Sequence, residues 1–260
     1  MSGLEGEREL RIWRLSWPEF ANLLGETDLV ILPVGVVEAH GPHLPLGTDF
    51  MLPERLAQDL APRLNAAVAP AIPYGVVGSL SAYPGTLGIS QSTLESLLFE
   101  VLRALAENGF DRVILINGHG GSEHVAAIKS ATRRAWRELG VRTVVVHWWI
   151  YAETLARESI GGGHAAGVEA AAVMAAYPEL VKTRSPAARE VYRVREGIEP
   201  FPAPGSVLLY RDQPADVPGE EASREFYSKL LDSLAAELER VLDGWDYQEI
   251  PIGEEVEEEG

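Results

Sequence analysis

Three side chains able to bind a metal ion occur within twelve positions, directly after an apolar stretch. They are Glu38, His40 and Asp49, and the turn between them is rich in glycine and proline. In an extended segment residues i and i+2 point to the same side, so Glu38 and His40 can converge, and the turn can bring Asp49 back toward them. Imidazole together with carboxylate suits Zn²⁺, Mn²⁺ or Fe²⁺. The segment is therefore a candidate metal site.

Two further clusters of this kind follow along the chain. An apolar run at 112–116 leads into Asn-Gly-His-Gly-Gly at 117–121, and a glycine-rich segment at 161–169 carries a histidine and a glutamate where a helix is expected to begin. In open α/β sheets ligands bind at such strand ends and helix starts. Four of the six histidines lie in these Gly- or Pro-rich loops, namely His40, His43, His119 and His164.

A purely structural interpretation stands beside the metal one, because short motifs also arise by chance. Glu38 and Asp49 can be ordinary loop or helix-cap carboxylates, and His40 can be a hydrogen-bonded loop histidine. His147 lies within an apolar run, so we interpret it as structural.

The elements expected to position these residues alternate between strand and helix. Apolar runs predict strands over 28–36, 67–72, 112–116 and 142–148, and helical spacing predicts helices over 49–64, 93–108, 123–139 and 220–242. This order predicts an α/β fold with three layers, in which a largely parallel sheet carries helices on both faces. The Pro- and Gly-rich segment 183–219 is expected to be an irregular excursion that closes over the site or meets a neighbouring subunit.

Length and composition narrow the class of protein. A chain of 260 residues with 46% hydrophobic content can bury one sizeable core. We therefore expect a single catalytic domain over 1–245 and a disordered acidic tail over 246–260.

The formal net charge of −17 argues against a nucleic-acid partner. No apolar run reaches the roughly eighteen residues of a membrane helix, and the N-terminus is charged, so neither a membrane span nor a secretory signal is expected. The absence of cysteine restricts metal ligands to nitrogen and oxygen and is compatible with a cytoplasmic location, which we expect.

The three clusters together resemble the creatininase family of metal-dependent amidohydrolases. The family pattern Glu-x-His-Gly-x-His-Leu-Pro-x-x-Thr-Asp is met by 38–49, Asn-Gly-His-Gly-Gly by 117–121, and His-Ala-Gly-x-x-Glu by 164–169, with Ala166 in place of the glycine. Pro-Tyr-Gly at 73–75, followed by Tyr-Pro-Gly-Thr at 83–86, forms a fourth element. The resemblance implies a creatininase-like fold, a small-molecule substrate and a homohexamer.

The resemblance also implies a metal centre with two divalent ions of Zn, Mn or Fe per subunit, because five candidate ligands exceed what one tetrahedral ion needs. Asp49 would bridge the ions. Together the ions would activate a water that attacks the carbonyl carbon, and the C–N bond then breaks. We expect His164 to move the proton as acid and base, with Glu169 beside it, and leave open whether Glu169 or Glu123 completes the second ion. The expected ligands are Glu38, His40, Asp49, His119 and Glu169.

Six residues are candidates for binding the substrate. The three glycines among them allow a substrate close to backbone N–H groups, as in an oxyanion site, although tight turns explain them as well. The paired tryptophans could form a substrate wall, although core packing explains one of the pair equally well. The candidates are Tyr83, Gly118, Gly120, Gly121, Trp148 and Trp149.

Two departures from the family bear on the substrate. Creatinine-hydrolysing members carry a glutamate two residues after the histidine of the Asn-Gly-His motif, where this chain has Gly121. The segment 77–80 is small and apolar where many members carry Ser-x-Glu-His. We therefore expect weak or no creatinine hydrolysis, and hydrolysis of another amide, cyclic amide or formamide. Alternatives within the family are a formamidopyrimidine nucleotide, a peptide of mycofactocin maturation, or a cyclic ketone.

One competing class is a non-catalytic metal-binding scaffold. Lost ligands would mark such a protein, and all the expected ligands are present. A nucleotide-binding protein is disfavoured because the sequence has neither Gly-x-Gly-x-x-Gly after a strand nor a P-loop lysine motif.

Overall fold

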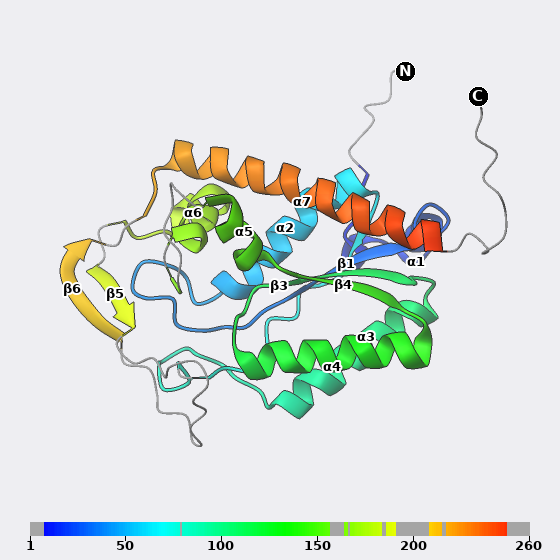
Figure 1. Cartoon of the computed structure of the whole chain (residues 1–260), viewed down its shortest axis with the longest axis horizontal. Coiled ribbons are helices and arrows are strands. Elements are labelled where there is room, and N and C mark those ends of the chain that lie inside the picture. The colour runs from blue at the N-terminus through cyan, green and yellow to red at the C-terminus, as the bar shows by residue number, and fades with distance from the viewer. Residues whose placement is uncertain are drawn as a thin grey trace.

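The centre of the molecule is a four-stranded parallel sheet with the strand order β2-β1-β3-β4 (Figure 1). The computed structural model describes residues 8–78, 80–156, 164–165, 167–183, 186–190, 208–214 and 217–248. The strands of the sheet are β1 (Leu29–Val34), β2 (Ala67–Val68), β3 (Arg112–Asn117) and β4 (Arg142–His147). The predicted α/β class is confirmed.

Helices connect the strands and cover both faces of the sheet. They are α1 (Trp17–Leu24), α2 (Thr48–Leu64), α3 (Gln91–Glu107), α4 (Ser122–Leu139), α5 (Trp148–Ala156), α6 (Gly167–Ala176) and α7 (Glu220–Gln248), with short 3₁₀ turns η1 (Ile12–Arg14) and η2 (Pro178–Leu180). In Figure 1, α2, α5, α6 and α7 lie on one side of the sheet and α3 and α4 on the other. Within the described ranges, no helix combines the length and apolar composition needed to cross a membrane.

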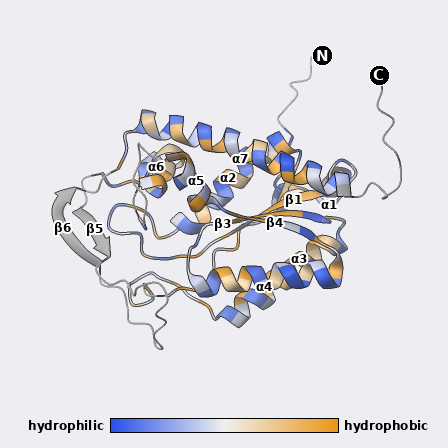
Figure 2. Cartoon of the chain, viewed as in Figure 1, coloured by the Kyte–Doolittle hydropathy of each residue, from blue (hydrophilic) through white to orange (hydrophobic). Residues whose placement is uncertain are grey.

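The alternation of side chains along the strands produces the three layers. Leu29 and Ile31 of β1 point into the core shared with α2, α6 and α7, whereas Val30, Leu32 and Val34 point into the core shared with α3 and α4. A strand buried on both faces reads as a continuous apolar run, which is why β1 could be predicted from sequence. Figure 2 shows the central strands coloured mainly as hydrophobic, between helices that mix hydrophobic and hydrophilic residues.

Three predicted strands end earlier than expected, and the one predicted over 28–36 ends at Val34. The strand predicted over 142–148 stops at His147, and Trp148 begins α5 instead. An apolar run does not distinguish a strand from a buried helix, which explains this error. The strand predicted over 67–72 shortens to Ala67–Val68, and Ile72 makes only an isolated bridge to Val34. Pro70 cannot donate a ladder hydrogen bond, which accounts for the interruption.

The C-terminal third differs from the sequence expectation in two places. The segment 183–219, expected to be irregular, contains an antiparallel pair, β5 (Pro186–Glu190) and β6 (Leu208–Pro214). Helix α7 continues to Gln248, past residue 246 where the acidic tail was expected to begin, and residues 249–260 lie outside the described part of the chain.

The strand order reverses between β1 and β3, and the first turn of α2 lies against the carboxyl ends of these two strands. Chain connections leave β1 toward β2 on one side and β3 toward β4 on the other, which opens a crevice where α/β proteins bind ligands. The backbone N–H of Gly118 donates to the carbonyl of Val34 at 2.9 Å. A Cβ at Gly118 would lie 1.8 Å from the backbone oxygen of Asp49, so only glycine allows this approach.

We predict that Gly118→Ala lowers the free energy of unfolding by about 2–3 kcal/mol, because the clash is with backbone and no flexible side chain can relieve it. Gly244→Ala is the matched control, since a Cβ there meets nothing within 4 Å and lies within α7, where alanine favours the helix. Urea unfolding of the two variants measures the difference. Equal stability of Gly118→Ala and the parent protein would contradict this packing.

Candidate metal centre

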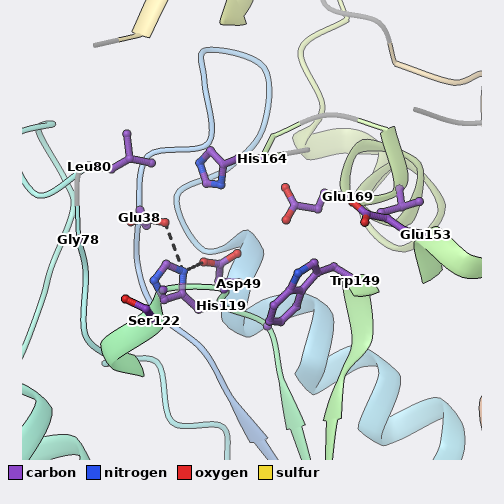
Figure 3. Close-up of a pocket in the computed structure, with 14 residues that line it drawn as sticks. Glu38, Asp49, Gly78, Leu80, His119, Ser122, Trp149, Glu153, His164 and Glu169 are labelled. Atoms are coloured by element: carbon purple, nitrogen blue, oxygen red, sulfur yellow. Dashed lines mark hydrogen bonds and ion pairs between the residues drawn. The ribbon is translucent and has the colours of Figure 1, made fainter. Parts of the chain in front are cut away.

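The side chains predicted to bind metal meet above the carboxyl ends of β1 and β3. Glu38 and His40 follow β1, Asp49 is in the first turn of α2, and His119 follows β3. Glu169 is in the first turn of α6. A cavity of about 500 Å³ opens onto this region, and Figure 3 shows Glu38, Asp49 and His119 at its base.

Asp49 lies between two buried imidazoles and places one carboxylate oxygen beside each. Its Oδ1 is 2.9 Å from Nε2 of His40, and its Oδ2 accepts a hydrogen bond from Nδ1 of His119 at 2.8 Å. Glu38 Oε2 is 3.4 Å from the same nitrogen of His119. The positive end of the α2 dipole favours a negative charge on Asp49 in the first turn. The carboxylate is therefore fixed by two imidazoles, one from the loop after β1 and one from the loop after β3.

The hydrogen bond of His40 Nδ1 leaves the lone pair of Nε2 facing the Asp49 carboxylate, where a proton or a metal ion would be stabilised. Its Nδ1 is 2.9 Å from the carbonyl oxygen of Glu38, which can only accept, so Nδ1 carries the proton. In the neutral ring Nε2 then presents a lone pair toward the Asp49 carboxylate. This buried nitrogen has no hydrogen-bond partner in the described part of the chain. Two facing lone pairs repel unless a proton or a metal ion lies between them.

A second group of candidate ligands comprises His40, His164 and Glu169, whose ligand atoms lie within 4.8 Å of one another. Nε2 of His164 donates to the carbonyl of Ala39 at 2.8 Å, which leaves Nδ1 with a lone pair. The backbone N–H of Ala165 donates to Glu169 Oε2 at 2.7 Å. The rings of His40 and His164 are 4.4 Å apart between centroids.

The pKa shifts of the clustered side chains show how each charge depends on its neighbours. Burial raises the pKa of Glu38 and of Glu169. Burial would also raise the pKa of Asp49, but His40 and His119 hold it well below its usual range. Burial alone would lower the pKa of His40, yet the Asp49 carboxylate raises it to about 10. The cluster thus favours positive charge beside Asp49.

The residues present fit divalent metal ions. Three buried carboxylates and three imidazoles form the two ligand groups Glu38–Asp49–His119 and His40–His164–Glu169, which are connected by the contact between His40 and Asp49. Nitrogen and oxygen donors in this proportion suit Zn²⁺, Mn²⁺ or Fe²⁺. The backbone carbonyls that fix the rings of His40 and His164 are the supporting contacts typical of metal-binding histidines.

The sequence matches the family model Creatininase, described as creatinine amidohydrolase, over residues 13–242. The chain belongs to the creatininase family. Creatinine amidohydrolase of Pseudomonas putida is 30% identical over 191 residues, which cover 65% of this chain and 73% of that protein. A mycofactocin precursor peptide peptidase of Mycobacterium ulcerans (strain Agy99) is 28% identical over 233 residues, covering 84% of this chain and 87% of that protein. A crystal structure of creatinine amidohydrolase (creatininase) is similar with a TM-score of 0.73 at 26% identity, covering 90% of this chain and 98% of that one. The chain is thus a creatininase-family hydrolase.

Of the six substrate-binding candidates in this creatininase-family chain, the three glycines and Trp149 line the cavity. Trp148 does not, because its side chain is 1% exposed and packs in the core on the α2 and α7 face of the sheet. Consecutive residues at the start of α5 point in different directions, so the helix buries one tryptophan and presents the other. Tyr83 lies in a turn and is not among the cavity-lining residues.

The two glutamates that could replace the family's missing carboxylate are placed very differently. Glu169 is buried within the second ligand group and lines the cavity. Glu123 is exposed and is not among the cavity-lining residues. At Gly121, a Cβ would lie 2.6 Å from Nε2 of His119, so the ring of His119 occupies the space that a side chain there would need.

The amide of Asn117 holds the loop that presents His119, a role that the sequence did not reveal. Its Oδ1 accepts from the backbone N–H of His119 at 3.0 Å and from Nε2 of His124 at 3.1 Å. Its Nδ2 donates to the backbone carbonyl of His119 at 2.9 Å and to Nδ1 of His147 at 3.0 Å. Both hydrogens and the oxygen of the amide are therefore used.

His124 is a buried neutral histidine, which sequence analysis overlooked. Its Nδ1 accepts from the backbone N–H of Val76 at 3.2 Å while its Nε2 donates to Asn117. Burial, with a further contribution from His119, lowers the pKa of His124 to about 3. A ring that stays neutral can hold this double hydrogen bond across the physiological pH range. The helical spacing that gave α4 could have shown that His124 points inward.

His43 connects the loop after β1 to the turn before α6. Its Nε2 donates to the carbonyl of Ala165 at 2.7 Å, and its backbone carbonyl accepts from the N–H of Lys182 at 2.9 Å. Because the backbone N–H of Ala165 also donates to Glu169, His43 helps to hold Glu169 in place through Ala165. The sequence indicates only that His43 lies in a loop.

We predict that Asn117→Asp weakens zinc binding by about 10- to 100-fold, the usual effect of losing a contact that orients a ligand. The new carboxylate oxygen would face the carbonyl oxygen of His119 and the lone pair on Nδ1 of His147. All of these are hydrogen-bond acceptors, so they would repel one another. Asn22→Asp, an exposed position on α1, is the control with the same change of charge. Competition with a chelating dye measures both affinities. Unchanged zinc affinity in Asn117→Asp would show that the amide does not orient His119.

Proposed function

We propose that this chain is an amidohydrolase that uses two divalent metal ions to cleave a C–N bond of a small molecule. The single observation that carries the proposal is the position of Asp49, whose two oxygens face His40 and His119 from opposite groups of candidate ligands. A single domain over residues 1–245 would carry this activity. A cytoplasmic location and a homohexamer remain expectations from the sequence.

The proposal assigns each ion its own ligands around the shared Asp49. Glu38 and His119 would hold one ion, and His40 and Glu169 the other, with Glu169 preferred over the exposed Glu123. When bound, such a pair of ions lowers the pKa of a water and polarises the carbonyl of the scissile bond.

The chain's own residues would supply positioning and proton transfer. Nε2 of His164 is engaged by the carbonyl of Ala39, so Nδ1 is the atom that can accept a proton and return it to the leaving nitrogen. Asn117 would keep the ring of His119 in place, and Trp149 would form one wall against the substrate.

The bond is proposed to be an amide, cyclic amide or formamide other than creatinine. The reason is the loss of polar partners at Gly121 and over 77–80, since a small polar ring would leave buried groups unpaired at about 1–3 kcal/mol each. A peptide bond is the second candidate, favoured by the peptidase relative that matches 84% of this chain. A cyclic ketone is a further alternative. A non-catalytic metal-binding scaffold is the alternative from another class.

The proposal is tested by elemental analysis of the purified protein and by a panel of cyclic amides, formamides and short peptides, with and without added Zn²⁺, Mn²⁺ or Fe²⁺. Hydrolysis of a panel member that a chelator abolishes and metal restores would support it. A protein that binds metal but hydrolyses no member would favour the scaffold alternative.

We predict that Asp49→Ala loses both metal equivalents, because neither ion would retain its shared carboxylate. Metal content measured after dialysis should fall from about two ions per chain to near zero. Asp232→Ala, an exposed α7 carboxylate paired with Arg63, is the control and should keep its metal. Asp49→Asn serves as a second variant in case the alanine protein does not fold. Retention of full stoichiometry in a folded variant would exclude the bridging role.

His164→Ala is predicted to keep both ions and to lose turnover by about 10²–10⁴-fold, the range expected when a proton-transfer group is removed. Metal content and kcat are measured on the same preparation. A folded variant that also loses one ion would make His164 a ligand, in line with its position near His40 and Glu169. Unchanged kcat would exclude it from proton transfer.

A further inference from the structure

The outer face of α4 carries a row of basic side chains, although the chain as a whole has a formal net charge of −17. Lys129, Arg133 and Arg137 are exposed and four residues apart, a spacing that places them on one face of the helix. They line a groove of about 500 Å³, which we call the α4 groove. Glu138 also lines it but is paired with Arg134 at 2.9 Å. No ion pair joins the three basic side chains to a carboxylate in the described part of the chain.

A second cavity, of about 280 Å³, connects the α4 groove to the end of α7. Arg133 lines both cavities, and Trp136 of α4 and Trp245 of α7 line the second one. The side chain of Trp136 is 58% exposed. Thr143, at the start of β4, lines the same cavity, and its Oγ1 is buried without a hydrogen-bond partner among the described residues. An exposed indole and an unpaired hydroxyl are both stabilised when a further segment covers them.

The acidic segment 249–260 begins where this second cavity lies. In Figure 1 the last turn of α7 and the end of α4 are at the same end of the sheet. The segment carries three apolar residues at 250–252 and five glutamates within 254–259. Its twelve residues span up to about 40 Å when extended, whereas Lys129 and Arg137 are only about 12 Å apart along the helix axis. The segment is therefore long enough to cover both cavities, and its apolar and acidic parts follow in the matching order.

We propose that segment 249–260 docks on α4 of its own chain. Residues 250–252 cover the cavity at Trp136, and the glutamates that follow pair with the basic row of the α4 groove. None of the residues that line the groove lines the cavity at the metal centre, so the inference does not depend on the proposed hydrolase function.

The physical basis is charge complementarity combined with a short tether. One exposed ion pair contributes little, so docking needs several pairs at once and a segment held at about millimolar effective concentration by its attachment to α7. Salt weakens such pairs, because the Debye length falls from about 10 Å at 0.1 M to about 3 Å at 1 M. The docked segment also covers the start of β4, the edge strand of the sheet, whose unpaired backbone groups are otherwise a template for another chain.

The test is digestion of the full-length protein by a glutamate-specific endoprotease, with the pieces released from 249–260 quantified by mass spectrometry. A docked segment is cut only when it detaches, so the cleavage rate measures the detached fraction. We expect the triple variant Lys129→Gln, Arg133→Gln, Arg137→Gln to be cut about tenfold faster than the parent protein. Trp136→Gln, which removes the apolar contact alone, should be cut about threefold faster.

A second triple variant controls for the change in net charge. Lys182→Gln, Arg224→Gln, Lys229→Gln removes the same charge from exposed positions outside the α4 groove and should be cut within about twofold of the parent rate. A synthetic peptide of residues 249–260 gives the rate for a segment that is never docked. Relative to this peptide, about 0.5 M NaCl should raise the parent rate to that of the groove variant.

Three results would overturn the inference. The parent protein and the groove variant could be cut equally fast, which would leave the groove to another partner. The control variant could accelerate as much as the groove variant, which would make the effect one of net charge. Protection that increases with protein concentration would mean that the segment docks on a second copy of the chain.

Discussion

The arrangement of the candidate site depends on one buried carboxylate that is shared by two imidazoles. Asp49 can face both His40 and His119 only because the first turn of α2 is seated against the ends of β1 and β3, where Gly118 lets the backbones approach closely. The geometry of the ligands is therefore set by the way the start of α2 packs against the ends of β1 and β3. A shift of α2 by a fraction of an ångström would change both contacts at once.

The reversal of strand order between β1 and β3 explains why residues far apart in sequence meet at this place. Loops that leave these strands in opposite directions open a crevice, and the helix dipole of α2 favours negative charge within it. The third segment, at the start of α6, joins through the contacts of His43 and His164 with backbone carbonyls. The centre thus depends on backbone as much as on side chains.

Sequence patterns predicted the parts of this arrangement that obey simple periodicities. The apolar run of β1 follows from strand geometry, and the resemblance supplied Glu169. The motif after β1 supplied Glu38 and His40, but these lie beyond the strand and belong to different groups of candidate ligands. The pattern did not reveal which of Trp148 and Trp149 would be buried, because that depends on where β4 stops and α5 begins. It also missed His124 and the amide contacts of Asn117, because these connect elements whose relative placement only the folded chain defines.

The hydrogen-bonded amide of Asn117 also bears on the chemical durability of the protein. Asparagine followed by glycine is the dipeptide in which the glycine nitrogen most readily attacks the side-chain amide. The attack expels ammonia and forms a cyclic imide, which water opens to isoaspartate or aspartate. In the folded chain that nitrogen donates to Val34 and the amide is held on both sides, so the attack is blocked. Unfolding by heat breaks the hydrogen bond of the glycine nitrogen and those of the Asn117 amide. Each unfolding event therefore exposes the dipeptide to irreversible deamidation. The same contacts that orient His119 therefore slow the deamidation of Asn117.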